Sequence, residues 1–151
     1  MTQKMLLGLG VLLMMCIAIQ LVPVSWSNPP VVSDISTPSA VKAVLQRACY
    51  DCHSHETVWP SYARVAPVSW LIAHDVREGR EELNFSAWGQ YDARQQAKKR
   101  KESWEEIAAG NMPPWYYTIV HPEARLSATD LTVLRAWAQE TTGARHAPGN
   151  Q

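Results

Sequence analysis

The sequence predicts an all-α fold that follows a single N-terminal transmembrane helix. Three observations lead to this fold class: an uncharged apolar run at the N-terminus, apolar residues that recur at helical spacing in several later segments, and prolines and glycines that separate those segments. A chain of 151 residues is long enough for one ordinary domain and a short appendage. The formal net charge is zero, so no global electrostatic field indicates a nucleic-acid partner.

The apolar run extends from Met5 to Val22 and is about long enough to cross a bilayer. No Ala-x-Ala cleavage site follows it, so we expect residues 1–27 to be an uncleaved signal anchor, with a cleaved signal peptide as the alternative. Lys4 precedes the run, and the next basic residue is Lys42. The positive-inside rule therefore keeps the N-terminus in the cytoplasm and exports the rest of the chain. Residues 28–147 are predicted to form the exported domain.

The segment Cys49-Tyr50-Asp51-Cys52-His53 reads C-x-x-C-H, which is the attachment signature for a c-type haem. Two thiols at this spacing can bond to the two vinyl groups of one porphyrin, and the following residue can present an imidazole to the iron. Cys49 and Cys52 are thus predicted to hold one haem c covalently, with His53 as the proximal ligand. A redox dithiol, a disulfide and half of a zinc site are the alternatives. Bacteria attach c-type haem outside the cytoplasmic membrane, which agrees with the predicted export.

The second axial ligand is predicted to be Met112, 59 residues after His53. It lies in Gly-Asn-Met-Pro-Pro, where Gly110 would end a helix and the two prolines would hold an extended strap. A thioether on such a strap can face the open side of a haem and stabilise reduced iron. The alternatives are His74 as the distal ligand, an open distal position, and Met112 as a core filler.

Helices are expected over residues 38–50, 67–78, 92–109 and 128–142, and the first of them would deliver the haem motif at its C-terminal end, as in cytochrome c folds. The expected caps are Thr37 before the first helix, Gly79 after the second, and Ser127 with Asp130 at the start of the last. Each helix has an expected apolar side, made in turn of Val41, Val44, Leu45 and Ala48; Val68, Leu71, Ile72 and Val76; Trp104, Ile107 and Ala108; and Leu131, Leu134, Trp137 and Ala138.

Two further polar features have simple interpretations. His55 is expected to face solvent, although it could bind a metal. The basic run from Lys98 to Lys101 is expected to be a solvated helix face that neighbouring glutamates balance, with a docking patch for an acidic redox partner as the alternative.

Several stretches between Asn28 and Trp137 resemble the bacterial haem-binding domain family, which consists of small membrane-anchored c-type cytochromes. The similar stretches are NPPV, ACYDCHSHET-x-WP, APVSW, EGREELNFSAW, MPPWYY and HPEARLS. The resemblance implies a cytochrome c-like domain over residues 28–147, covalent haem at Cys49 and Cys52, iron bound by His53, and a periplasmic location. By similarity to Met-Pro cytochromes, Met112 takes the other axial position.

The expected function is that of a monohaem c-type cytochrome, a periplasmic electron-transfer protein held at the inner membrane by its N-terminal helix. Iron with two protein ligands has no free site for a substrate, so we expect an electron carrier and not an enzyme. The expected partners are transient redox proteins, with no nucleic acid. The alternative is a haem enzyme or a gas or redox sensor with an open distal site, in which His74 or His55 would act as the acid or base.

Overall fold

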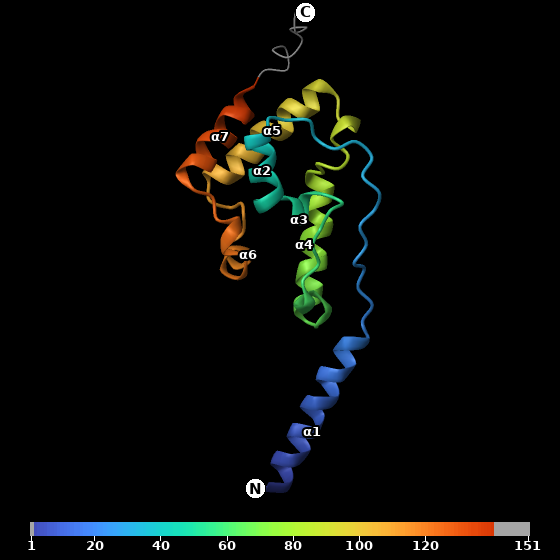
Figure 1. Ribbon diagram of the computed structural model, residues 1–151. Coiled ribbons are helices and arrows are strands. Elements are labelled where there is room, and N and C mark those ends of the chain that lie inside the picture. The colour runs from blue at the N-terminus through green and yellow to red at the C-terminus, as the bar shows by residue number, and fades with distance from the viewer. Residues whose placement is uncertain (1, 141–151) are drawn as a thin grey trace, which may run out of the picture.

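The computed structural model describes residues 2–140 and is helical over them, as the sequence predicts (Figure 1). The described part of the chain contains no β-strand, and one isolated bridge joins Ser33 to Ala87. The α-helices are α1 (Thr2–Ala18), α2 (Ser39–Ala48), α3 (Tyr50–His53), α4 (Val68–Glu82), α5 (Ala93–Ala108), α6 (Trp115–Val120) and α7 (Ala128–Gln139).

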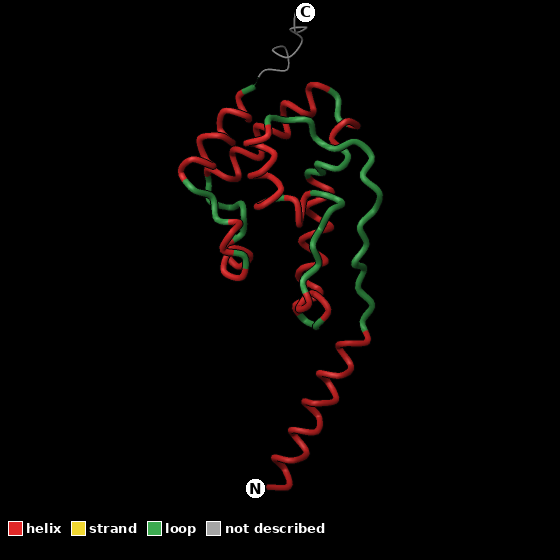
Figure 2. Tube along the Cα trace, in the orientation of Figure 1, coloured by secondary structure: helices red, strands yellow, loops and turns green. Residues whose placement is uncertain are grey.

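The N-terminal helix stands apart from the rest of the molecule (Figure 1). α1 and the short 3-10 helix Ile19–Leu21 together provide an apolar span, Gln3–Leu21, that is long enough to cross a membrane and is not buried in the domain. This confirms one N-terminal apolar helix, which could be a membrane anchor or a signal sequence. A long loop then runs along one side of the domain to the start of α2 (Figure 2).

The core forms where α2 and α5 pack against α7. Its largest fully buried side chains include Leu45, Phe85 and Leu134, and Trp137 of α7 packs against Trp88 with 6.2 Å between ring centroids. Burial of these apolar surfaces is the main free energy that holds the short helices together. The expected apolar face of α2 is confirmed, because Val41, Val44, Leu45 and Ala48 are all buried.

The ends of three helices differ from the expected ones. Pro38, with an extended ψ of 145°, occupies the N-cap position of α2, so the expectation that Thr37 caps this helix is wrong by one residue. α4 continues through Gly79 to Glu82, so Gly79 is not a C-cap. α7 ends at Gln139. Residues 141 and 142 of the predicted last helix, and residues 141–147 of the predicted domain, lie outside the described residues.

The expected apolar sides of α4 and α5 are only partly buried. Val76 of α4 is buried, but Val68 and Leu71 are exposed, and Ala108 of α5 is exposed as well. α6, between the Met-Pro-Pro strap and α7, has no counterpart among the predicted helices. The start of α4 and α6 both lie at the end of the domain from which α1 extends (Figure 1).

Candidate functional site

The Cys-x-x-Cys-His segment forms one tight turn at the end of α2. Cys49 leaves the helical conformation with φ −130° and ψ −31°, and α3 begins directly after it. The Cys49 carbonyl accepts hydrogen bonds from the N–H groups of Cys52 (3.2 Å) and His53 (2.9 Å). The two thiols and the imidazole therefore belong to one rigid turn. Both cysteines are free thiols that keep some solvent exposure.

The His53 ring is held in one orientation by α4. Its Nδ1 lies 2.8 Å from the carbonyl oxygen of Gly79 and 3.1 Å from that of Leu83, so Nδ1–H donates to both oxygens. This tautomer leaves the lone pair on Nε2, the nitrogen that would face a metal. Burial lowers the pKa of His53, which favours the neutral imidazole that binds metals. The ring is therefore held as a neutral imidazole whose Nε2 lone pair can bind a metal.

Gly79 brings α4 against this turn. A Cβ atom at position 79 would lie 2.7 Å from the Cys52 carbonyl oxygen, which is closer than real Cβ atoms approach, and 3.1 Å from the Cys52 Cβ, which is a tight contact. Only glycine allows this contact in the middle of a helix. The same residue supplies the carbonyl that orients His53, so Gly79 serves the site twice.

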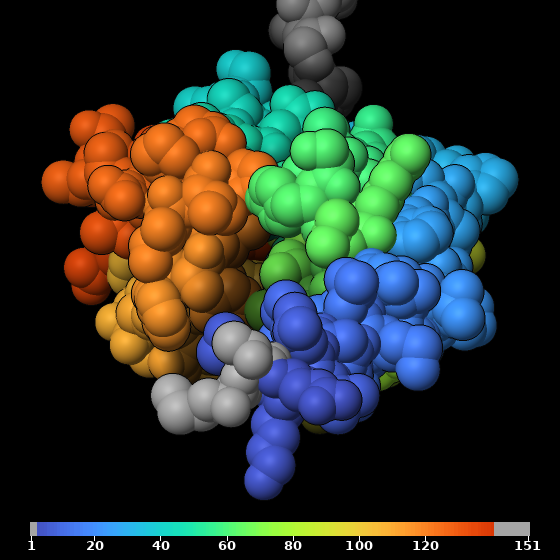
Figure 3. Space-filling model, turned by 90° about the horizontal axis from the view of Figure 1, so that it is seen from below, coloured from blue at the N-terminus to red at the C-terminus, as the bar shows by residue number. Residues whose placement is uncertain are grey.

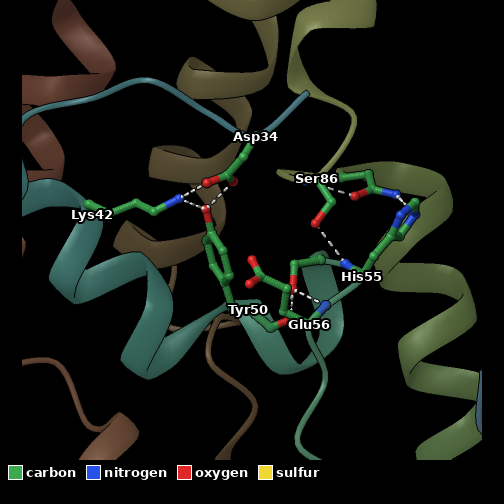
Figure 4. Close-up of polar contacts among 8 residues, drawn as sticks. Asp34, Lys42, Tyr50, His55, Glu56 and Ser86 are labelled. Carbon is green, nitrogen blue, oxygen red and sulfur yellow. Dashed lines mark hydrogen bonds and ion pairs between the residues drawn. The ribbon is translucent and has the colours of Figure 1, made fainter. Parts of the chain in front are cut away.

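The second residue of the motif, Tyr50, fixes the turn to the N-terminal part of the domain (Figure 4). Its hydroxyl donates to Asp34 Oδ1 (2.8 Å) and accepts from Lys42 Nζ (2.5 Å), while Lys42 also pairs with Asp34. Burial opposes ionisation of Asp34, but the bonds from Lys42 and Tyr50 outweigh it and lower the Asp34 pKa. The Tyr50 ring stacks on Phe85 at 5.3 Å, so the turn is held by both polar and apolar contacts.

The third residue of the motif, Asp51, joins the turn to α6. Its Oδ1 accepts from the Val58 N–H (2.9 Å), and its Oδ2 accepts from the Tyr117 hydroxyl (2.7 Å). α6 also contacts α4, because the Tyr116 hydroxyl donates a hydrogen bond to Asp75 Oδ2 at 3.1 Å. α6 is therefore held against α3 and α4.

Met112 lies on that strap and is 40% exposed. Gly110 ends the preceding helix with φ +76°, as expected, and the N–H groups of Asn111 and Met112 both donate to the Glu106 carbonyl. The exposure contradicts the alternative that Met112 is a buried core filler. The space-filling view shows a hollow between the orange segment that contains α6 and the green segment that contains α4 (Figure 3).

His74 and His55 lie in other surroundings. His74 is exposed on the linker side of α4, where it contacts Arg77 (3.0 Å) and helps line a cavity of about 530 Å³ beside linker residues 23–27. The expectation that His55 faces solvent is wrong: its Nδ1 bonds to the Pro30 carbonyl (2.9 Å) and its Nε2 to the Asn84 amide (2.7 Å; Figure 4). With both ring nitrogens engaged, His55 holds the loops together.

The basic run on α5 is a solvated face only in part. Lys98 and Lys101 are exposed and pair with Glu102 and Glu105, each at 3.4 Å. Arg100, in contrast, is 6% exposed and contributes to the packing of α5.

The residues of this site fit a haem iron. Imidazole nitrogen and thioether sulfur are both axial ligands of haem iron, and the two thiols lie on the same turn as the imidazole. Burial raises the pKa of Cys49 and of Cys52 to about 12, whereas redox-active dithiols have lowered thiol pKa values. Within residues 2–140, no three His, Cys, Asp or Glu side chains are grouped so that they could hold a metal ion alone. These observations disfavour the redox-dithiol and zinc alternatives.

The sequence analysis did not predict the groups that orient the Cys49–His53 turn. These are chiefly the Gly79 and Leu83 carbonyls and the Tyr117 hydroxyl. Their only sequence signal is that they lie within the stretches EGREELNFSAW and MPPWYY, which resemble the family.

Comparison with known proteins agrees with this geometry. A family model described as a haem-binding domain matches residues 14–140, which is most of the chain. No curated protein and no solved structure matches the chain. The chain therefore belongs to the haem-binding domain family.

Proposed function

We propose that this protein is a monohaem c-type cytochrome that carries single electrons on the periplasmic side of a bacterial inner membrane. The observation that carries the proposal is the Cys49–His53 turn, in which two free thiols accompany an imidazole whose Nδ1–H is already bonded to two carbonyls. The turn combines covalent attachment points with an oriented ligand, which is the arrangement that c-type haem requires.

In this proposal Cys49 and Cys52 hold the porphyrin through thioether bonds, His53 binds the iron through Nε2, and Met112 binds it through its sulfur. A bound haem supplies one-electron redox chemistry, and a thioether ligand raises its potential by stabilising the reduced state. Tyr50 and Tyr117 keep the turn and α6 in place, so the ligands need not rearrange when the charge changes. With both axial positions occupied, the protein has no site for a substrate.

The alternative is a haem enzyme or a gas or redox sensor with an open distal site. Such a site needs an acid or base close to the iron. Neither candidate is well placed, because His55 is bonded through both ring nitrogens and His74 lies on the linker side of α4. The electron carrier is therefore the better supported function.

The first test is production of the full chain in a bacterium that attaches haem c. A pyridine haemochrome assay and the intact mass of the purified protein should both show one covalent haem. Cys49→Ser and Cys52→Ser should each weaken attachment, whereas Cys16→Ser in α1 should not. A polypeptide mass without haem would contradict the proposal. The same mass spectrum shows whether residues 1–27 are retained.

Met112→Ala tests the distal ligand. We expect it to keep the covalent haem, to lower the midpoint potential by on the order of 0.1 V, within the ~0.8 V range that axial ligands span, and to let carbon monoxide bind the reduced protein. His74→Ala is the matched control and should leave the visible spectrum unchanged. If His74→Ala altered the spectrum and Met112→Ala did not, the distal ligand would be His74.

A further inference from the structure

Several large apolar side chains are exposed at the end of the domain from which α1 extends. We name it the apolar end and define it by Val58, Val65, Val68, Trp115 and Ile119, all of which are exposed. Residues 57–73 contain a single charged residue, Arg64, and residues 111–120 contain none. Seen from below, the orange and green segments that carry these residues face the viewer, as does the blue segment that contains α1 (Figure 3). An apolar area of this kind marks an interaction surface.

The outward side of α6 is separate from its site-facing side. Tyr116 and Tyr117 face α4 and α3, to which their hydroxyls are bonded. Trp115 and Ile119 lie one helical turn apart on the same face of α6 and are 73% and 60% exposed. A group bound between α4 and α6 would contact the tyrosine side and leave Trp115 and Ile119 exposed.

Hydrogen bonds hold the end of the anchor against this same part of the domain. The Gln20 amide forms a two-way bond with the backbone of Ala66: its Oε1 accepts from Ala66 N–H (2.9 Å) and its Nε2 donates to the Ala66 carbonyl (3.2 Å). The Trp26 indole donates to the Ala63 carbonyl at 2.9 Å. Both bonds reach the segment that carries Val65 and Val68. The chain that follows α1 is therefore bonded to the domain and is not a free linker.

The linker is held further along its length by α4. Arg80 donates to the Ser27 carbonyl and to Asn28 Oδ1, each at 2.9 Å, and the Asn28 amide donates to the Thr57 carbonyl at 2.9 Å. If α1 crosses a membrane, these bonds fix which end of the domain faces that membrane.

We propose that the apolar end lies on the lipid bilayer that α1 spans, with its apolar side chains in the boundary between headgroups and acyl chains. The proposal rests on retention of the anchor, which is part of the proposed function. Tryptophan and tyrosine favour this boundary, and an exposed Arg64 without acidic neighbours in its segment suits lipid phosphates. The far end of the domain has the opposite character, because α5 exposes the ion-paired residues Lys98 and Lys101 to water (Figure 1).

The docked orientation has a consequence for the site. The hollow between α4 and α6 is visible from the side of the molecule that carries α1 (Figure 3). A domain that rests on its apolar end therefore holds the site close to the membrane surface.

The test uses the full, haem-loaded chain in vesicles of phosphatidylethanolamine and phosphatidylglycerol. A photo-crosslinking amino acid replaces Val65 or Ile119 in two variants and Lys98, which is exposed on α5, in a control variant. We expect lipid adducts at positions 65 and 119 at least tenfold above those at position 98. Equal adduct yields at all three positions would overturn the proposal, as would crosslinks between two copies of the chain in place of lipid adducts.

The visible spectrum, a haemochrome assay and the intact mass of the same samples show which assumption fails when no lipid adduct forms. The visible spectrum of each variant shows that the domain has folded. A haemochrome assay that finds no covalent haem contradicts the proposed function, and a mass without residues 1–27 contradicts the retained anchor. Folded, anchored and haem-loaded protein that forms no lipid adduct contradicts the docking alone.

Discussion

At the scale of single residues, a side chain at position 79 would clash directly with the Cys-x-x-Cys-His turn. Gly79→Ala would place a methyl group 2.7 Å from the Cys52 carbonyl oxygen, and neither helix backbone can give way easily. We expect a loss of about 1–3 kcal/mol in the free energy of unfolding and a lower yield of covalent haem. Thermal melting and a haemochrome assay measure the two effects. Glu81→Ala, on the exposed side of α4, is the control, and equal behaviour of the two variants would contradict the close approach.

Asp130 provides a pH-dependent contribution to stability. Burial raises its pKa, but hydrogen bonds from Ser127 and Arg47 outweigh this, so the pKa lies below its usual value of 3.8. A carboxyl with a lowered folded-state pKa stabilises the protein fully above the unfolded value and loses that effect as the pH falls through the folded value. Asp130→Asn should therefore cost on the order of 1 kcal/mol at pH 7 and progressively less below about pH 4.

Urea unfolding of both proteins at neutral pH and near pH 3 tests this linkage. Because both proteins have the same Cys-x-x-Cys-His turn and the same Met112, acid effects on that site cancel in the difference. A difference in stability that stays constant between the two pH values would show that the Asp130 charge does not contribute.

At the scale of elements, the Tyr117 hydroxyl links α6 to the Cys-x-x-Cys-His turn, beside the Tyr116 bond that links α6 to α4. Burial raises the pKa of Tyr117, and the neighbouring Asp51 raises it further, so the phenol stays protonated and donates to Asp51. Tyr117→Phe keeps the ring stacked on His121 but removes this bond, at a cost of about 1 kcal/mol. The Met112 strap precedes α6, so we expect looser distal ligation and several-fold faster carbon monoxide binding to the reduced protein.

The control for α6 is Tyr91→Phe, which removes a hydroxyl bonded to the Asn84 N–H, far from α6 in the sequence. Flash photolysis or stopped-flow mixing with carbon monoxide measures the rates. If both variants bound carbon monoxide at the same rate as the unmodified protein, the Tyr117–Asp51 bond would not control the distal side.

The sequence predicted those elements whose signals are local. α5 and α7 begin with capping boxes at Asp92 and Ser127, and the apolar spacing of α2 gave its buried face correctly. α6 was missed because its six residues are too few to show a periodicity. Gly79 was misassigned because a glycine at a helix end and a glycine at a close helix contact look alike in the sequence.

For the site, too, the sequence predicted the residues that are close together along the chain but not the contacts between distant segments. Cys49, Cys52 and His53 lie on one turn, so their spacing alone predicts their common role. The groups that orient His53 are backbone carbonyls 26 and 30 residues further along the chain, and a carbonyl has no sequence signature. His55 was misjudged for a similar reason, because its two ring partners are 25 and 29 residues away.

At the scale of the whole molecule, Gln20 joins the apolar N-terminal segment to the rest of the domain. It is the strongly polar member of the apolar run from Met5 to Val22, and its amide bonds to both backbone groups of Ala66. Gln20→Ala removes the acceptor of the Ala66 N–H. The lost bond is worth about 1–2 kcal/mol, so amide exchange at Ala66 should become roughly 5–30-fold faster.

Hydrogen exchange of the full chain in vesicles, read on a peptide that spans residues 62–70, measures this change. Gln46→Ala on the exposed side of α2 is the matched control and should leave the peptide unaffected. In the same variant pair, Gln20→Ala should also reduce lipid crosslinking from position 119, since the domain can then tilt about the end of α1. Unchanged exchange at Ala66 together with unchanged crosslinking would mean that the anchor positions the domain without this bond.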